Sequence, residues 1–195
     1  GAAAVYQELA AAPTSVHGLK ACIAYGMIPG HQVTTADASK AYVQADLKSK
    51  FPTWIELPPA LRPEWWKNKF FKPVVRLIKG LYGHPEAGAH WEQHLHDILS
   101  RLGGHKSAEF PGNYYFDRSH GFAGLYLCVY VDDLNLAGPA DLHGLFWQRL
   151  TTFVDLEEPT EIDRVLGRHH RVVSTARANT FEGEAPNAAL CDSDR

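Results

Sequence analysis

Apolar residues recur at helical spacing in four parts of the chain, and each part predicts a helix. The first part follows Ser15, a favourable capping residue, and ends at the Pro-Gly pair of positions 29–30. The strongest pattern covers residues 85–102, with Pro85 in its first turn and a Gly-Gly pair behind it. Weaker patterns cover residues 38–45 and 141–153. The residues expected to be buried in the three longer helices are Val16, Leu19, Ile23 and Met27; Ala87, Trp91, Leu95, Ile98, Leu99 and Leu102; and Leu142, Leu145, Phe146, Leu150 and Phe153.

Strands are expected over residues 33–36, 113–116 and 125–131, with a second apolar run after position 133. Five prolines divide residues 47–80 into loops and short extended pieces. This order of strands and helices favours an α+β fold over a parallel wound sheet. The length of 195 residues suits one domain, or one and a part.

Two adjacent aspartates, Asp132 and Asp133, lie between two apolar runs, where the chain must turn. Their carboxylates repel each other there, and no basic residue is near them in sequence. A divalent cation would remove this cost, and a third carboxylate from elsewhere would complete a Mg²⁺ site. An ordinary hairpin with Asp as a turn residue is the alternative. These residues alone favour neither interpretation.

Charge is unevenly distributed although the net charge is only −3. Residues 62–79 contain six basic residues and one acid, with four aromatic residues among them. Basic groups neutralise phosphates and aromatic rings stack on bases, so this mixture suits a nucleic-acid surface. The alternative is a solvated face whose aromatic rings belong to the core. The basic residues are Arg62, Lys67, Lys69, Lys72, Arg76 and Lys79, and the aromatic ones are Trp65, Trp66, Phe70 and Phe71.

Cysteines, hydropathy and histidines bear on the compartment, the partners and a further possible metal site. Three cysteines lie far apart and form no CxxC, so we expect free thiols in an intracellular protein, without distinguishing cytoplasm from nucleus. No apolar run approaches the ~18 residues of a membrane-spanning helix, so no membrane partner is expected. His90 and His94 are four residues apart on a predicted helix and could share a metal in a hydrolase, although solvated histidines are the simpler interpretation.

Five segments carry a family resemblance. Residues 130–133 read Tyr-Val-Asp-Asp, and Asp37 at a predicted strand end is followed five residues later by Tyr42. Residues 54–59 read Trp-Ile-Glu-Leu-Pro-Pro, residues 81–91 Leu-Tyr-Gly-His-Pro-Glu-Ala-Gly-Ala-His-Trp, and residues 165–168 Val-Leu-Gly-Arg. In this order they resemble the YxDD box, first palm motif, hydrophobic-x-x-P-P loop, YGLKQAxRxW segment and FLGxxI strand of Ty1/copia-type retrotransposon reverse transcriptases.

The resemblance implies an RNA-directed DNA polymerase that transfers nucleotides from dNTPs to a primer 3′-OH with two Mg²⁺ ions, which Mn²⁺ could replace. It implies a template of RNA or DNA with its primer, and further segments of a larger polyprotein. Tyr42 would exclude a ribose 2′-OH. The implied catalytic residues are Asp37, Asp132 and Asp133; the metal ligands are these three and the carbonyl of Ala38; the substrate-binding residues are Lys40, Ala41, Tyr42 and Glu86; the nucleic-acid-binding residues are Lys67, Lys69, Lys72, Arg76, Lys79 and Tyr130.

The implied fold is a polymerase palm, an antiparallel sheet with helices on one face, with partial fingers. Residues 1–32 would be a helical remainder of the fingers, residues 33–170 the palm with a fingers insertion at about 47–80, and residues 171–195 an irregular tail. Glu86 stands where the family has Gln, and the basic fingers strand and the thumb are not recognised. The isolated chain is therefore expected to be incomplete, and a catalytically inactive remnant that keeps the palm fold and binds nucleic acid is the alternative.

Overall fold

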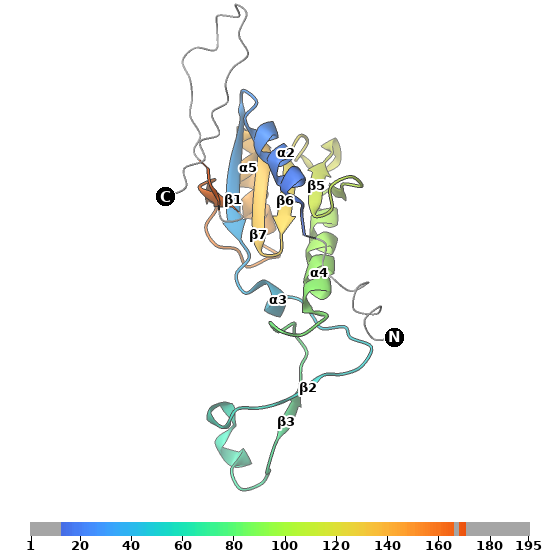
Figure 1. Ribbon diagram of the computed structural model, residues 1–195, viewed down its shortest axis with the longest axis vertical. Coiled ribbons are helices and arrows are strands. Elements are labelled where there is room, and N and C mark those ends of the chain that lie inside the picture. Colours follow the sequence, from blue (N-terminus) through green and yellow to red (C-terminus); the bar gives the residue numbers. More distant parts are fainter. Residues whose placement is uncertain (1–12, 166–167, 171–195) are drawn as a thin grey trace, which may run out of the picture.

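The computed structural model describes residues 13–165 and 168–170. Within these residues the centre of the molecule is a six-stranded antiparallel sheet with the order β4-β5-β6-β7-β1-β8. Figure 1 shows β1, β7 and β6 side by side in its middle. A mixed fold with an antiparallel sheet agrees with the expected α+β class. The strands are β1 (His31–Asp37), β4 (Gly104–Lys106), β5 (Asn113–Phe116), β6 (Tyr126–Tyr130), β7 (Asp133–Pro139) and β8 (Thr160–Glu161).

Two helices, α4 (Ala87–Arg101) and α5 (Ala140–Leu150), pack on one face of the sheet and form its main core. The stripe predicted for residues 85–102 is confirmed, because all six of its members are buried. On the strands, alternate residues such as Leu127, Val129, Leu134 and Leu136 point to this face, as the two-residue period of a strand requires.

A third helix, α2 (Val16–Gly26), packs on the opposite face against Val33, Cys128 and Ala137. The expectation of helices on one face was therefore incomplete. The predicted stripe of α2 was right at Leu19 and Ile23 but wrong at Val16 and Met27, which are exposed, and it missed Gly18 and Gly26, which are buried. Glycines allow the helix backbone to approach the sheet closely, and a pattern of large apolar residues does not reveal such a face.

The buried face of α5 also differs in part from the prediction. Leu145 and Phe153 are exposed, whereas His143 and Trp147 are buried. Both buried side chains bond to Thr34 of β1, so polar anchors as well as apolar contacts set the rotation of this helix. The helix predicted over residues 38–45 is only the four-residue α3 (Ala41–Gln44).

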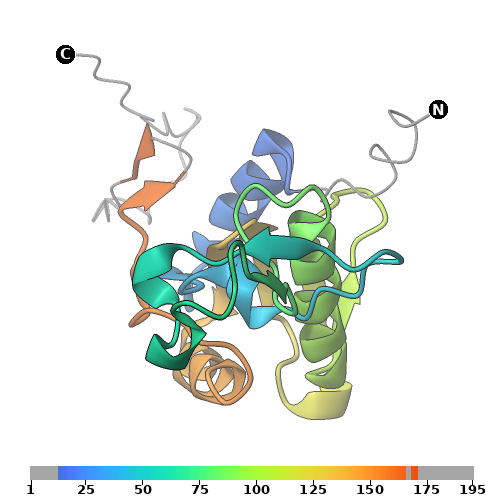
Figure 2. The same ribbon diagram turned by 90° about the horizontal axis from the view of Figure 1, so that it is seen from below.

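Residues 47–80 form a lobe that projects from the sheet beyond α3, as Figures 1 and 2 show. It contains the hairpin β2 (Trp54–Glu56) and β3 (Val74–Arg76), and the short turns η1 (Pro59–Leu61) and η2 (Glu64–Trp66). Its two ends are held together by a backbone hydrogen bond from Leu47 to Ile78, and a bond from Gly80 to Ala45 joins its base to the body that contains the sheet. We call residues 47–80 the lobe from here on.

The rest of the described chain comprises η3 (Arg118–His120) and a small ladder of β9 (Arg164–Val165) and β10 (Arg168–His169). Residues 1–12, 166–167 and 171–195, which include the predicted tail and the middle of the FLGxxI-like strand, lie outside the described residues. No helix in the described part of the chain is long and apolar enough to cross a membrane.

Candidate active site at the ends of β1, β6 and β7

The predicted catalytic aspartates meet at one end of the sheet. Asp37, the last residue of β1, lies directly opposite Asp133, the first residue of β7. Residues directly opposite in an antiparallel pair have Cβ atoms about 4.5–5.5 Å apart on the same face. This is the face that α2 covers further along the same strands, through Val33 and Ala137. Two of the predicted site residues, distant in sequence, are thus neighbours.

Burial and the neighbouring carboxyl groups make a negative charge on Asp133 costly. Burial, a hydrogen bond with Asp37 and the charges of Asp37 and Asp132 together raise the pKa of Asp133 to about 7. A divalent cation would offset the repulsion between the carboxylates, and carboxylate oxygens are the ligands that Mg²⁺ prefers. The donor chemistry therefore fits a divalent metal. Among the described residues, however, no three His, Cys, Asp or Glu side chains converge in a metal-binding arrangement.

Asp132 occupies the tight turn between β6 and β7. Val131, the residue before it, has φ +57°, which is uncommon for a β-branched residue. The backbone N–H of Ala38 donates to the Asp132 carbonyl at 2.8 Å, and the Trp91 indole N–H donates to the Val131 carbonyl at 2.6 Å. The turn is thus held from both sides. Tyr130 ends β6 beside it, paired with Asp133.

The predicted nucleotide-binding residues surround the short helix α3. Lys40 precedes it with φ 51°, and Ala41 is fully buried, so only its backbone could reach a ligand. The ring of Tyr42 packs against Tyr82, with centroids 4.5 Å apart. Burial, and next the charge of Asp132, raise the pKa of Tyr82. The Tyr82 phenol therefore lies close enough to the turn to be affected by the charge of Asp132.

Glu86, which stands where the family has Gln, lies beside His90 with 3.8 Å between Oε2 and Nε2. Both side chains are mostly covered, and these two atoms have no hydrogen-bond partner in the described part of the protein. The carboxylate is thus directed toward a histidine of α4. His90 and His94 do not form a metal site with a third ligand among the described residues, so the hydrolase alternative gains no support.

The lobe exposes its basic and aromatic side chains. Phe71 is 90% exposed and Trp65 63%, so these rings do not belong to the core. Lys69 lies over the ring of Trp65, and Lys72 over that of Phe71. Other basic residues form exposed ion pairs, which contribute little to stability: Arg62 with Glu56, Lys67 with Glu64, and Lys79 with Asp46.

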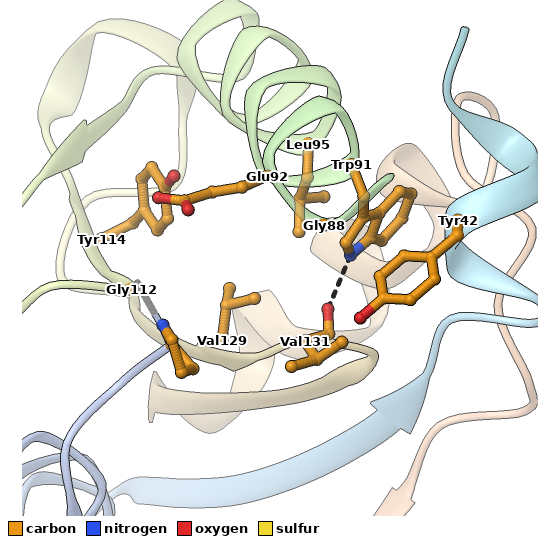
Figure 3. Close-up of a pocket in the computed structure, with 10 residues that line it drawn as sticks. Tyr42, Gly88, Trp91, Glu92, Leu95, Gly112, Tyr114, Val129 and Val131 are labelled. Carbon is orange, nitrogen blue, oxygen red and sulfur yellow. Dashed lines mark hydrogen bonds between the residues drawn. The ribbon is translucent and has the colours of Figure 1, made fainter. Parts of the chain in front are cut away.

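A small pocket lies between α4 and the β6–β7 turn, with Tyr42, Trp91, Tyr114 and Val131 in its wall (Figure 3). Two residues that contact predicted site elements, Trp91 at the aspartate turn and Tyr82 at Tyr42, were not assigned a site role from the sequence. Trp91 belongs both to the helical pattern and to the recognised segment of residues 81–91, but neither gave its N–H donor a role. Tyr82 belongs to a recognised motif, but its partner Tyr42 is forty residues away in sequence.

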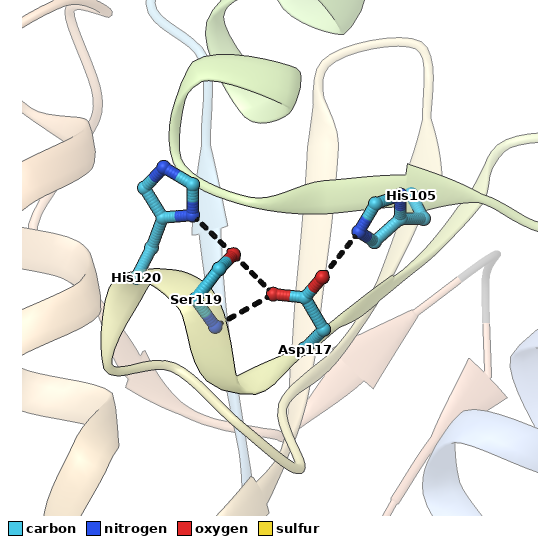
Figure 4. Close-up of polar contacts among 4 residues, drawn as sticks. All are labelled: His105, Asp117, Ser119 and His120. Carbon is cyan, nitrogen blue, oxygen red and sulfur yellow. Dashed lines mark hydrogen bonds and ion pairs between the residues drawn. The ribbon is translucent and has the colours of Figure 1, made fainter.

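A second polar cluster, drawn in Figure 4, contains residue types found in hydrolases. His105 Nε2 lies 2.8 Å from one oxygen of Asp117, and the Ser119 hydroxyl and N–H donate to the other. These hydrogen bonds, chiefly from Ser119, hold the pKa of Asp117 well below its usual value. His120 Nδ1 lies 2.6 Å from the Ser119 hydroxyl oxygen. Because Ser119 donates to a carboxylate that caps η3, the cluster is a capping network rather than an activated nucleophile.

Comparison with known proteins identifies the family. The family model described as reverse transcriptase (RNA-dependent DNA polymerase) matches residues 2–172 of this 195-residue chain. The chain belongs to this family. A putative transposon Ty5-1 protein of Saccharomyces cerevisiae is 27% identical over 132 residues, which are 67% of this chain and 40% of that relative. The chain thus spans about two fifths of the length of the relative, and the Ty1/copia-type resemblance is confirmed.

Proposed function

We propose that this reverse transcriptase chain is the nucleotidyl-transfer domain of a copia-type retroelement polymerase. The observation that carries the proposal is the Asp37–Asp133 carboxyl pair, whose cost a divalent cation would offset, beside the turn that carries Asp132. Its substrates would be dNTPs and the 3′-OH of a primer on an RNA or DNA template.

Asp37, Asp132 and Asp133, with the carbonyl of Ala38, would hold Mg²⁺ or Mn²⁺. When bound, such ions lower the pKa of an attacking hydroxyl and neutralise a triphosphate. The backbone of residues 40–42 would lie against the triphosphate, and Tyr42 under the sugar. Glu86 would lie nearby, its charge compensated by His90 when that ring is protonated.

The lobe would bind the template. Its exposed cations can neutralise phosphates, and its exposed rings can stack on bases. Tyr130, next to the aspartate turn, would contact the primer end. Because the Ty5-1 relative is much longer than this chain, further segments of a polyprotein would complete the grip on the duplex.

Primer extension by the purified chain, with Mg²⁺ or Mn²⁺ and a primed RNA template, tests the proposal. Asp132→Asn and Asp37→Asn should each abolish extension, because each removes a charge and a ligand from the site. Asp97→Asn, a change of the same chemistry at an exposed position of α4, should leave extension unchanged. Extension that survives Asp132→Asn would refute the assignment.

The inactive remnant remains the second candidate, and the carboxylate of Glu86 is the observation that favours it, because His90 compensates this charge only when its ring is protonated. A carboxylate beside a triphosphate is unfavourable unless it is compensated. Glu86→Gln restores the family residue and separates the two cases. An active polymerase should gain nucleotide affinity from this change, whereas a chain that binds primer–template but never extends it, with either residue, is a remnant.

A further inference from the structure

One buried hydrogen bond connects α4 to the aspartate turn. The indole N–H of Trp91 donates to the backbone carbonyl of Val131 at 2.6 Å, and Trp91 is only 2% exposed. Figure 3 shows the ring reaching from α4 onto the turn, beside Tyr42. The accepting carbonyl belongs to the peptide group that leads into Asp132.

The turn needs such an anchor because its backbone is strained. Val131 adopts φ +57°, and a β-branched side chain in this region is a conformational outlier. Such conformations persist only where surrounding contacts determine them. If Val131 relaxed to a negative φ, the peptide group that it shares with Asp132 would rotate, and the Asp132 carboxylate would move with it.

Two contacts oppose this relaxation. Trp91 holds the peptide group before Asp132, and the Ala38 N–H holds the one after it. The second contact follows from β1 lying beside β7 and involves only backbone atoms. The first depends on a side chain from another layer of the fold, so a single substitution can remove it.

We propose that Trp91 is a positioning residue for the reaction. Its indole N–H keeps the strained turn in the conformation that carries Asp132 at the end of the sheet where Asp37 and Asp133 lie opposite each other. The inference rests on the proposed function and deepens it, because it names a residue other than the three aspartates on which the metal-binding geometry depends. Trp91 acts through Val131 and contacts neither metal nor nucleotide.

A matched pair of variants separates this role from simple core packing. Trp147 of α5 is also buried, 4% exposed, and its indole N–H donates to Thr34 Oγ1 at 2.8 Å, away from the turn. Trp91→Phe and Trp147→Phe each remove one buried indole hydrogen bond. Mn²⁺ affinity, measured by electron paramagnetic resonance of free Mn²⁺, should fall about tenfold for Trp91→Phe, equivalent to about 1.4 kcal/mol. It should stay within about twofold for Trp147→Phe. Equal Mn²⁺ affinity of both variants would overturn the inference.

A second substitution tests whether the effect passes through the strained turn. Glycine adopts positive φ without cost, so the turn of Val131→Gly has no strain to release. Adding Trp91→Phe to Val131→Gly should therefore reduce Mn²⁺ affinity much less than Trp91→Phe alone. A tenfold loss in both backgrounds would show that Trp91 supports the site by packing and not by holding the turn.

Failure of the proposed function would give a different result. If the unaltered chain binds no Mn²⁺, the metal site is refuted. Hydrogen exchange of the ¹⁵N-labelled indole groups then tests separately whether Trp91 donates a protected hydrogen bond to the turn. The Trp91 N–H, identified by its loss in Trp91→Phe, should exchange at least about 100-fold more slowly than that of Trp65, which is 63% exposed. Equal exchange rates would refute the anchor itself.

Discussion

Tyr42 and Tyr82 are the residues that would select between nucleotide sugars. Their rings pack 4.5 Å apart, so Tyr82 restricts the position of Tyr42. Tyr42→Ala should open the space of a 2′-OH and reduce discrimination against ribonucleotides by about 10- to 200-fold, as expected of one small group in a tight pocket. Deoxynucleotide extension should persist, and the ratio of kcat/KM for dNTP and rNTP measures the change.

Tyr82→Ala should give a smaller loss of the same discrimination, because Tyr42 stays but loses its neighbour. Tyr115→Ala, at a half-exposed position of β5 stacked on His105, is the control and should change nothing. If Tyr82→Ala admits ribonucleotides as well as Tyr42→Ala does, Tyr82 itself contacts the sugar, and the assignment of Tyr42 as the selective residue is wrong.

His143 makes the stability of the fold depend on pH. Its Nε2 lies 3.2 Å from the Gly138 carbonyl, which can only accept, so Nε2 carries the proton and Nδ1 accepts from the Thr34 hydroxyl. Burial lowers the pKa of His143 from 6.5; His31 adds to this, while the Gly138 bond and Asp141 oppose it. The neutral ring is therefore the one that the fold accommodates.

The direction of the pH effect follows from this lowered pKa. Below pH 6.5 the unfolded chain takes up a proton that folded His143 does not, so the free energy of unfolding should fall as the pH is lowered. Urea titrations of the wild-type chain and of His143→Gln between pH 7.5 and about 5 should show a shallower slope for the variant. His17→Gln, at an exposed position of α2, should keep the wild-type slope. Equal slopes for all three proteins would contradict the prediction.

At the scale of elements, glycines set the position of α2. A side-chain methyl on Gly26 would collide with Val33 and lie 3.0 Å from the Gln32 carbonyl oxygen. Gly26→Ala should therefore lower the free energy of unfolding by about 1–2 kcal/mol, because overpacking outweighs the gain in helix propensity. Gly144→Ala in α5, with nothing within 4 Å of the added methyl, should raise it by up to about 1 kcal/mol. A stabilised Gly26→Ala would show that α2 does not pack closely on β1.

An element can be predicted from the sequence when large apolar residues form its buried face. The helix over residues 85–102 and the strand Asn113–Phe116 were predicted well, because large apolar residues mark their buried faces. The face of α2 could not be predicted in this way, because close packing there uses glycines. The sequence did not show whether the aromatic rings of the lobe are exposed or belong to the core, because exposed and buried tryptophans look alike in a sequence.

The candidate site was likewise predicted only in part. The family resemblance implied that Asp37 and the Asp pair belong to one site, and the register of β1 and β7 brings Asp37 opposite Asp133. The resemblance did not predict that Asp133, rather than Asp132, would lie opposite Asp37. Strand register depends on tertiary pairing, and a one-residue shift exchanges the faces of the two aspartates. The metal and nucleotide roles of these residues remain predictions.

At the scale of the whole molecule, the lobe and the body depend on different interactions. The buried cores are built from the sheet and its helices, and among the described residues no member of them comes from residues 47–79. Replacing residues 51–76 by a short Gly-Ser linker should therefore leave the thermal midpoint within a few degrees, and scanning calorimetry would show it. A fall of more than about 10 °C would mean that the lobe supports the body, because in a domain of this size about 1 kcal/mol shifts the midpoint by 2–4 °C.

Template binding, in contrast, should depend on the lobe and on salt. Replacing Lys69, Lys72 and Arg76 together by Gln should weaken primer–template binding and reduce the slope of log affinity against log salt by up to about 2–3, since each lost phosphate contact removes about 0.7–0.9. The control replaces three exposed cations of the body, Lys20, Arg101 and Arg118, which changes the net charge equally and should reduce the slope less. Fluorescence anisotropy between about 50 and 200 mM salt measures both. Equal slopes for the two triple variants would show that the cations of the lobe contact phosphates no more than other exposed cations do, and the lobe would then have no specific role in holding the template.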